Sequence, residues 1–415
     1  MELNAKQREA VEAGVKSEAF ILTGGPGTGK TTTMKAMVEA LRADNQRAML
    51  LAPTGKAALR MQTVIGMPAT TIHRAIFGQS VRDHFARHNV VLVDEASMVD
   101  SPLMGRLANH IVASGIRLVL VGDPNQLTPV GPGKPFEDAV NSGAVPAVHL
   151  ERVYRQREKS WVLDNAYKIL DGEMVDLEDQ DDFRFIESSD ITMSAIEYIS
   201  DKWERNIPSQ EFQLITPQRI DSKSKDTGAT TERINSVLQE NMEPDAPGVF
   251  DMEWGKKFKH GDRVIQTCNN YAAGVVNGQL GNIVHASSEG VRVKFDETFG
   301  EGEDEGIWYA DAPGNLSIPD PSELDLAYAI TVHKSQGSQW PYVAFIADER
   351  HSSMLQRRLF YTAVTRTEKH LTIIGSRGAV ARAIRSASSS DRNTLLEEKL
   401  RGTFSFRGSQ DIPDI

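Results

Sequence analysis

Short apolar runs alternate with longer amphipathic stretches along the first 150 residues. Phe20–Leu22, Arg47–Ala52, Val90–Glu95 and Arg117–Asp123 each contain several consecutive apolar residues, which is typical of strands buried on both faces. A helical or loop segment follows each of these runs. The alternation predicts an α/β domain with a parallel sheet whose two faces are covered.

The same alternation returns after residue 150 and is interrupted once. Between residues 260 and 318 the apolar runs become short and alternating, and Asn-Gly, Gly-Asn and Ser-Glu-Gly turns separate them. This pattern is typical of a small antiparallel barrel. We therefore expect a first α/β domain over 1–150, a second over 151–259 and 319–415, and a barrel over 260–318 inserted in the second. The strands expected in the second α/β domain are Phe183–Glu187, Phe212–Thr216, Leu326–Val332, Val343–Ala347 and Leu371–Ser376.

The composition places the chain among globular proteins. A length of 415 residues suits two or three domains. The one cysteine, Cys268, excludes an internal disulfide and fits a reducing cytoplasm. No apolar run approaches the roughly 20 residues that a membrane helix needs, and the N-terminus does not resemble a signal peptide. We expect a cytoplasmic protein without membrane contact.

The charge distribution is uneven. A formal net charge of −11 argues weakly against a nucleic acid partner. Much of the acid, however, is clustered in Asp171–Asp182 and Asp296–Glu305, which we interpret as solvated loops or faces. The rest of the chain is close to neutral and is compatible with a local basic groove. In the basic tail, we expect Arg382, Arg385 and Arg392 to form a solvated helix face rather than a phosphate contact.

The segment Glu18–Lys35 carries the strongest chemical signal. An apolar strand, the sequence G-x-x-x-x-G-K-T and a helix follow one another, which is the pattern of a phosphate-binding loop. Glycines let consecutive backbone N–H groups converge on phosphate oxygens, Lys30 reaches the β- and γ-phosphates, and the Thr31 hydroxyl is suited to Mg²⁺. A glycine-rich turn without function is the alternative, and the flanking strand and helix weigh against it. The residues expected to bind the nucleotide here are Gly25, Pro26, Gly27, Thr28, Gly29, Lys30, Thr31 and Thr32.

Four further polar residues complete the candidate nucleotide site. Asp94 and Glu95 end a buried strand, where Asp94 can hold Mg²⁺ and Glu95 can deprotonate the attacking water. Gln126 follows the next strand and is a candidate γ-phosphate sensor, with a turn-stabilising amide as the alternative. Gln7 lies three residues after Asn4, so it either closes a capping box or reads the edge of a purine base.

Seven sequence blocks, in this order, resemble superfamily 1 DNA helicases. The blocks are GGPGTGKTTT, APTGKAA, VLVDEASM, GDPNQLTPV, VYRQ, TVHKSQGSQW and YTAVTR. The nearest likeness is to the RecD-like branch, and the short length resembles the phage Dda type. The resemblance implies two RecA-like domains that clamp ATP between them, with an SH3-like barrel inserted in the second.

The resemblance also implies roles for particular residues in ATP hydrolysis. Gln7 would recognise adenine and Tyr154 would stack on the base. Arg155 and Arg366 would reach the γ-phosphate as arginine fingers, which in other nucleotide hydrolases contribute roughly 10³–10⁵ in rate. A surface charge is the alternative role for Arg155, and a salt bridge is the alternative for Arg366.

A second set of polar residues resembles the single-strand contacts of this family. Hydroxyls, amides and a few lysines at strand ends suit contact with a nucleic acid backbone without reading of bases. In the barrel, Asn269, Asn270 and Asn277 are more typical of turns than of contacts. The residues expected to contact DNA are Pro53, Thr54, Lys56, Thr71 and His73 in the first domain, and Thr331, His333, Lys334 and Gln336 in the second.

The chain departs from the family pattern in three places. Residues 78–89 form only a short segment where the family has its strand-splitting pin, which puts efficient duplex separation in doubt. Gln339-Trp340 stands where the branch often has an acid and a smaller aromatic residue, so the ribose contact there is expected to differ. We also expect the motor to begin at residue 1, without the N-terminal extension of longer relatives.

These observations predict an ATP-dependent DNA helicase or single-stranded DNA translocase that uses ATP and Mg²⁺. The direction 5′ to 3′ is implied by the branch alone. The expected partners are single-stranded DNA, tailed or forked duplexes, and replication or recombination proteins, with a monomeric motor. The alternatives are a translocase that displaces proteins with little unwinding, a motor subunit of a recombination complex, and a slowly hydrolysing nucleotide switch.

Overall fold

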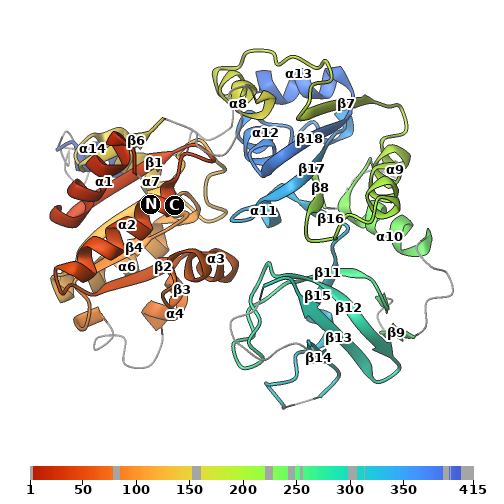
Figure 1. Cartoon of the computed structure of the whole chain (residues 1–415), viewed down its shortest axis with the longest axis horizontal. Coiled ribbons are helices and arrows are strands. Elements are labelled where there is room, and N and C mark those ends of the chain that lie inside the picture. The colour runs from red at the N-terminus through yellow and green to blue at the C-terminus, as the bar shows by residue number, and fades with distance from the viewer. Residues whose placement is uncertain are drawn as a thin grey trace, which may run out of the picture.

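The computed structural model describes residues 3–77, 85–151, 160–219, 228–241, 248–252, 256–297, 306–312, 314–386, 392 and 394–402. Figure 1 shows three bodies: two α/β domains side by side and an antiparallel body below the second. Among the described residues, no helix is long and apolar enough to span a membrane.

The first domain is built on a six-stranded parallel sheet in the order β3-β2-β4-β5-β1-β6. Helices α1, α2 and α3 cover one face of the sheet, and α4, α6 and α7 cover the other. Its strands are β1 (Ala19–Gly24), β2 (Ala48–Ala52), β3 (Ala69–Thr71), β4 (Val90–Val93), β5 (Arg117–Gly122) and β6 (Ala147–Leu150). Its helices are α1 (Ala5–Lys16), α2 (Lys30–Ala43), α3 (Gly55–Ile65), α4 (Ile72–Phe77), a 3₁₀ turn at Ala96–Met98, α6 (Ser101–Ser114) and α7 (Pro135–Ser142).

The second domain is built on a five-stranded parallel sheet in the order β16-β8-β17-β18-β7. Two apolar clusters fill its two faces, one around Phe345 and Phe360 and the other around Ile199 and Leu214. Its strands are β7 (Phe183–Glu187), β8 (Phe212–Thr216), β16 (Ala329–Thr331), β17 (Trp340–Ala347) and β18 (Thr367–Gly375). Its helices are α8 (Trp161–Asp171), α9 (Ile191–Glu204), α10 (Thr231–Asn241), α11 (Val332–Ser335), a 3₁₀ turn at Glu349–His351, α12 (Arg357–Val364) and α13 (Arg377–Arg385).

The antiparallel body lies in the chain between α10 and β16. Five strands pair in the order β14-β13-β12-β11-β15, and the β9-β10 hairpin lies beside β12. They surround a small core that includes Phe258, Val293 and Tyr309. The strands are β9 (Val249–Asp251), β10 (Lys257–Lys259), β11 (Arg263–Gln266), β12 (Leu280–Ser287), β13 (Gly290–Phe295), β14 (Ile307–Tyr309) and β15 (Leu324–Leu326), with a 3₁₀ turn at Pro321–Glu323.

The antiparallel strands reach beyond the range of 260–318 that the sequence suggests. They begin at Val249 and end at Leu326, so the apolar run Leu326–Val332 is divided between two sheets. The buried amide of Asn235 marks the division, since it donates to the carbonyls of Leu326 (2.9 Å) and Ala329 (3.1 Å) and accepts from Ala329 N. A continuous apolar run gives no sign of this change, because Leu326 packs on the core of the antiparallel body and Val332 on that of the second domain.

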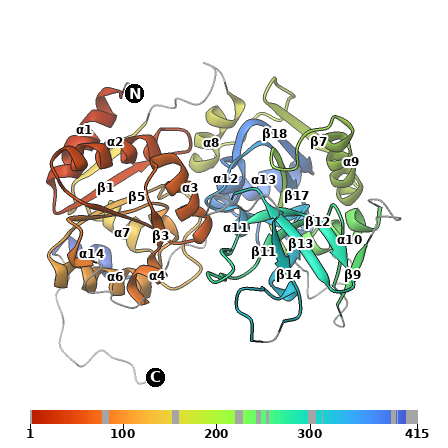
Figure 2. The same ribbon diagram turned by 60° about the horizontal axis from the view of Figure 1, so that its bottom comes forward.

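The C-terminal segment returns to the first domain. Helix α14 (Leu396–Leu400) packs on α7, and Figures 1 and 2 show its blue ribbon among the red and orange elements of the first domain. Arg392 donates to the carbonyls of Pro129 (2.6 Å), Gly131 and Gly133 (2.8 Å), and Thr394 donates to Asp138 (2.8 Å). The expectation that Arg392 lies on a solvated helix face is therefore wrong. We call residues 392 and 394–402 the C-terminal strap.

Candidate functional site

The predicted phosphate loop lies between β1 and α2, where the sequence places it. Gly27 and Gly29 adopt left-handed backbone angles (φ 70° and 89°), which favour glycine. A Cβ at Gly29 would also collide with the Gln7 amide. The Thr28 hydroxyl donates to Gly25 O at 2.9 Å and holds the loop closed. The loop therefore has a backbone conformation that favours glycine at positions 27 and 29.

Lys30 lies against this loop. Its Nζ donates to the carbonyls of Gly24 (2.7 Å) and Gly25 (2.9 Å). Burial lowers the pKa of the Lys30 ammonium, and the carboxylates of Asp123, Glu95 and Asp94 act in the opposite direction. Because the ammonium is buried and its two hydrogen-bond partners are neutral carbonyls, an anion that enters the site would stabilise its charge.

Asp94 and Glu95 follow directly on β4. Glu95 has φ 49° and ψ 39°, a left-handed conformation that costs a non-glycine residue roughly 1–3 kcal/mol and is found mostly at functional sites. Its backbone N–H donates to Asp94 Oδ1 at 2.9 Å. Burial raises the pKa of the Asp94 carboxyl, and the neighbouring Glu95 charge raises it further. The strand end thus presents two carboxyl groups in a site that disfavours two negative charges.

Residues of both α/β domains line one cavity of about 160 Å³ beside the phosphate loop, which we call the shared cavity. The structure brings together the predicted loop, Asp94, Glu95, Gln126 and, from the second domain, Arg366. The residues lining it are Pro26, Gly27, Gly29, Lys30, Thr31, Thr32, Ala57, Arg60, Asp94, Glu95, Gln126, Gly337, Gln339 and Arg366.

Arg366 and Gln126 are both buried in this cavity wall. Arg366 is 2% exposed and donates to Thr362 O at 3.0 Å and Ser338 O at 3.3 Å. Burial lowers the pKa of its guanidinium, and the Glu95 charge opposes this effect. No carboxylate among the described residues forms a salt bridge with Arg366. The Gln126 carboxamide oxygen, also buried, has no hydrogen-bond partner in the described chain, so no turn-stabilising bond from that oxygen is seen.

Gln7 forms the capping box that its spacing suggests. Asn4 and Gln7 each accept the other's backbone N–H, at 2.7 and 3.0 Å. The Gln7 Nε2 also approaches Thr28 O at 3.5 Å, so the capped end of α1 touches the phosphate loop. Adenine recognition by Gln7 stays a prediction. Tyr154 and Arg155 lie outside the described residues.

Several side chains that join the domains were missed by sequence reasoning. Arg60, one turn after Lys56 on α3, donates to Gln339 Oε1 at 2.8 Å and lies in the shared cavity. Arg358 forms a bidentate pair with Glu137 (2.6 and 3.0 Å). The spacing of Arg60 from Lys56, four residues along one helix face, is the one signal that could have indicated its position.

The five DNA candidates of the first domain lie around the N-terminus of α3 and at α4. Pro53 and the N-cap residue Thr54 precede α3, and Thr54 accepts from Ala57 N at 3.2 Å. Lys56 lies over the Trp340 ring of the second domain, 5.3 Å from its centroid. The antiparallel body covers Thr71, whose hydroxyl lies 3.1 Å from Tyr271 Oη, whereas His73 is exposed.

The four candidates of the second domain face different surroundings. Thr331 caps α11 and, with Lys334, lines a hollow at the junction with the antiparallel body. His333 lines another hollow beside residues 127–130, and burial lowers its imidazole pKa. Gln336 is 8% exposed. The structure therefore does not place all nine candidates on one open surface.

The pin-like segment is described only in part. Residues 78–84 lie outside the described residues, and Phe85 is fully buried and stacks on His110. Phe85 is therefore not available to separate strands.

The donor set of the shared cavity suits Mg²⁺. The Thr31 hydroxyl and the Asp94 carboxylate line the same cavity, and Mg²⁺ typically takes one or two protein oxygens together with waters and phosphate oxygens. The described residues contain no group of three His, Cys, Asp or Glu that could hold a metal by themselves.

Comparisons with known proteins identify the family. Residues 2–190 match an AAA domain family, residues 234–295 the ATP-dependent RecD-like DNA helicase SH3 domain, and residues 326–374 the UvrD-like helicase C-terminal domain. The chain is 33% identical to the ATP-dependent RecD2 DNA helicase of Deinococcus radiodurans over 413 residues, which covers 96% of this chain and 52% of the relative. It is 30% identical to the RecBCD enzyme subunit RecD of Mycolicibacterium smegmatis, covering 95% of this chain and 75% of that one.

Solved structures agree on the fold. Bacteroides Pif1 bound to single-stranded DNA superposes with a TM-score of 0.59 at 18% identity, covering 90% of this chain and 92% of that one. The likeness supports two RecA-like domains, and the family match supports an SH3 domain beside them. The chain spans about half the length of the Deinococcus relative.

Proposed function

Because the chain belongs to the RecD-like superfamily 1 helicases, we propose that it is an ATP-dependent DNA helicase that translocates on single-stranded DNA. The observation that carries the proposal is the shared cavity, in which Lys30 and Glu95 of the first domain face Arg366 of the second. A site divided in this way couples phosphate occupancy to the closure of two domains.

The proposed hydrolysis divides its tasks among these side chains. Lys30 neutralises the β- and γ-phosphates, and Glu95 takes the proton of the attacking water. Arg366 stabilises the charge that develops on the transferred phosphoryl group. Thr31 and Asp94 would hold Mg²⁺, which neutralises phosphate charge when bound. Gln126, whose side chain lines the same cavity, would sense the γ-phosphate by donating from its carboxamide nitrogen.

The remaining assignments extend the site. Gln7 and Tyr154 would bind the adenine base, and Arg155 would act as a second arginine finger. On the nucleic acid side, the seven candidate contacts other than the buried Thr71 and Gln336 would grip the backbone in alternation as the cleft closes and opens. The direction 5′ to 3′ rests on the family branch, and we propose a monomeric, cytoplasmic motor that acts on tailed or forked duplexes.

A second candidate function is favoured by the short pin-like segment. The segment 78–89 is short, and Phe85 within it is buried in the core. A translocase that displaces proteins, or a motor subunit within a recombination complex, would not need a long pin. The relative from Mycolicibacterium smegmatis is named as a subunit of such a complex.

The test combines two assays on wild-type protein and Lys30→Ala. We expect single-stranded DNA to stimulate ATP hydrolysis, and Lys30→Ala to abolish it. Displacement of a strand from a 5′-tailed but not a 3′-tailed duplex would support the helicase and its direction. Stimulated hydrolysis without displacement would select the translocase, and hydrolysis that ignores DNA would reject both.

A further inference from the structure

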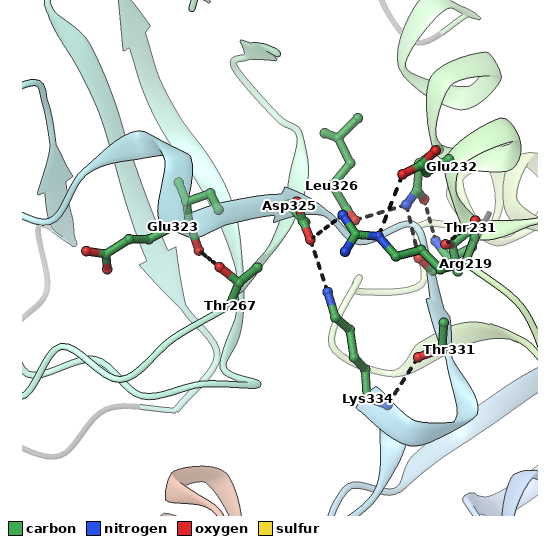
Figure 3. Close-up of polar contacts among 12 residues, drawn as sticks. Arg219, Thr231, Glu232, Thr267, Glu323, Asp325, Leu326, Thr331 and Lys334 are labelled. Atoms are coloured by element: carbon green, nitrogen blue, oxygen red, sulfur yellow. Dashed lines mark hydrogen bonds and ion pairs between the residues drawn. The ribbon is translucent and has the colours of Figure 1, made fainter. Parts of the chain in front are cut away.

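Three cationic side chains surround the carboxylate of Asp325 at the junction of the second domain and the antiparallel body. Asp325, in β15, lies 2.9 Å from Lys256 Nζ, 3.1 Å from Lys334 Nζ and 3.5 Å from an Arg219 guanidinium nitrogen. Figure 3 shows Arg219 reaching Asp325 from the side and Lys334 reaching it from below. Burial alone would raise the pKa of the Asp325 carboxyl, but Lys256 and Lys334 outweigh it and hold the pKa below its ordinary value. Asp325 is therefore a fixed anion.

The cations outnumber the anions at this junction. Glu232 is the other carboxylate near Arg219, at 3.6 Å, so three cations face two carboxylates. The excess positive charge stands out in a chain whose formal net charge is −11. A local excess of this kind favours an anionic ligand.

The three cations are not equally available. Lys256 Nζ donates hydrogen bonds to Leu324 O (3.0 Å), Asp325 (2.9 Å) and Ser322 O (3.5 Å). All three donors of its ammonium are therefore used within the protein, and its role is structural. Lys334 Nζ has Asp325 as its one hydrogen-bond acceptor in the described part of the chain. The guanidinium of Arg219, 54% exposed, makes only the two longer approaches to Asp325 and Glu232 among the described residues. Arg219 and Lys334 thus keep donors for a ligand.

A hollow of about 260 Å³ lies beside these two cations, which we call the junction hollow. Its wall includes Arg219, Lys334 and Thr331, and its floor includes the apolar side chains of Phe258 and Ile265. Thr331 and Lys334 are also among the residues expected to contact DNA. The junction hollow therefore continues the proposed strand path from α11 towards the antiparallel body.

We propose that Arg219 and Lys334, both held on Asp325, form a subsite for one phosphodiester group of the bound nucleic acid strand. The guanidinium and the ammonium supply charge-assisted hydrogen bonds, and Asp325 acts as a positioning residue that fixes their spacing. The subsite rests on the proposed function, since the strand is its ligand.

The test measures binding of a fluorescent oligodeoxythymidylate at several salt concentrations. Each phosphate contact on a single strand contributes roughly 0.7 to the slope of log K against log salt. We expect Arg219→Gln to weaken binding and to lower this slope by about 0.7. Arg219→Lys keeps the positive charge and should retain most of the wild-type slope. Arg205→Gln, an exposed ion-paired arginine at the end of α9, serves as the matched control and should change neither.

A double variant tests whether one phosphate is shared. If Arg219 and Lys334 hold the same phosphodiester, Arg219→Gln with Lys334→Gln lowers the slope no further than either single change. A fall of about 1.4 would mean two separate contacts and would overturn the shared subsite. An unchanged slope in Arg219→Gln, with wild-type binding intact, would overturn the subsite while leaving the proposed function standing. Wild-type protein that fails to bind the strand would reject the proposed function itself.

The Asp325→Asn variant tests whether Asp325 positions Arg219 and Lys334 or only contributes negative charge near the bound strand. Removal of a carboxylate should by charge alone tighten binding of a polyanion. If Asp325 positions the two cations, binding instead weakens, and the thermal melting midpoint shows whether the variant is folded. Tighter binding by the folded variant would contradict the positioning role.

Discussion

The Tyr361 hydroxyl donates a 2.8 Å hydrogen bond to Oδ2 of Asp123, and both side chains are buried. Tyr361 belongs to α12 of the second domain, whereas Asp123 follows β5 of the first. The bond therefore crosses the boundary between the domains, next to the shared cavity. Its length of 2.8 Å and its charged acceptor place it among the stronger hydrogen bonds of the chain.

Tyr361→Phe should lower the free energy of unfolding by about 1.5–3 kcal/mol, because a buried carboxylate loses its hydroxyl donor. Urea denaturation measures the change. Tyr342→Phe is the control, since Tyr342 lies in β17 within the second domain. A Tyr361→Phe protein as stable as the wild type would mean that the domains do not rest in this arrangement in solution.

Arg366→Ala should slow DNA-stimulated ATP hydrolysis by about 10³, because the guanidinium acts on charge that develops during phosphoryl transfer. Binding of a fluorescent ATP analogue should change little. Arg366→Lys keeps the charge but not the planar fork, and should recover part of the rate. A protein that loses nucleotide binding but hydrolyses at the normal maximal rate would contradict the finger role.

Lys56 predicts a pH dependence of DNA binding. Burial lowers the pKa of its ammonium from 10.5 to about 8, with Glu297 and Asp296 opposing the shift and Arg263 and Arg60 adding to it. Since the pKa is depressed, the charge is present below pH 8 and is lost as the pH rises through it. Affinity for single-stranded DNA should therefore weaken about tenfold between pH 7 and pH 9 if Lys56 meets a phosphate. Lys56→Arg stays charged and should flatten the profile; an equal slope in both proteins would exclude Lys56 as its source.

The C-terminal strap should stabilise the first domain. A chain that ends at Ser386 loses the three carbonyl contacts of Arg392 and leaves the fully buried Asp138 without Thr394. We expect a cost of about 1–3 kcal/mol from the loss of these hydrogen bonds, seen as a lower melting midpoint. A chain that ends at Gly402 keeps the strap and should melt like the full chain. Equal midpoints for both truncations would show that the strap does not stay docked.

The sequence predicts the local parts of this molecule well. Strands such as β1 and β5 and the phosphate loop depend on neighbouring residues, whose periodicity and glycine spacing are visible in one short window. The meeting of Arg60 with Gln339 joins residues 279 positions apart, and that of Tyr361 with Asp123 joins residues 238 apart. No periodicity encodes such pairs, because they depend on how two complete domains are oriented.

Two incorrect expectations have the same origin. Arg392 follows a basic, serine-rich stretch whose composition resembles a solvated surface, yet its acceptors are backbone carbonyls that composition does not reveal. The run Leu326–Val332 changes sheets at a point set by the amide of Asn235, almost a hundred residues earlier in the chain. In both places the partner, rather than the segment itself, determines the structure.

The C-terminal strap has a mechanical consequence. The polypeptide passes from the first domain to the second after residue 151 and is back on the first domain by residue 392. The chain therefore links the two domains at two places while the strap stays docked, and a swing that opened the cleft widely would have to pull α14 off α7.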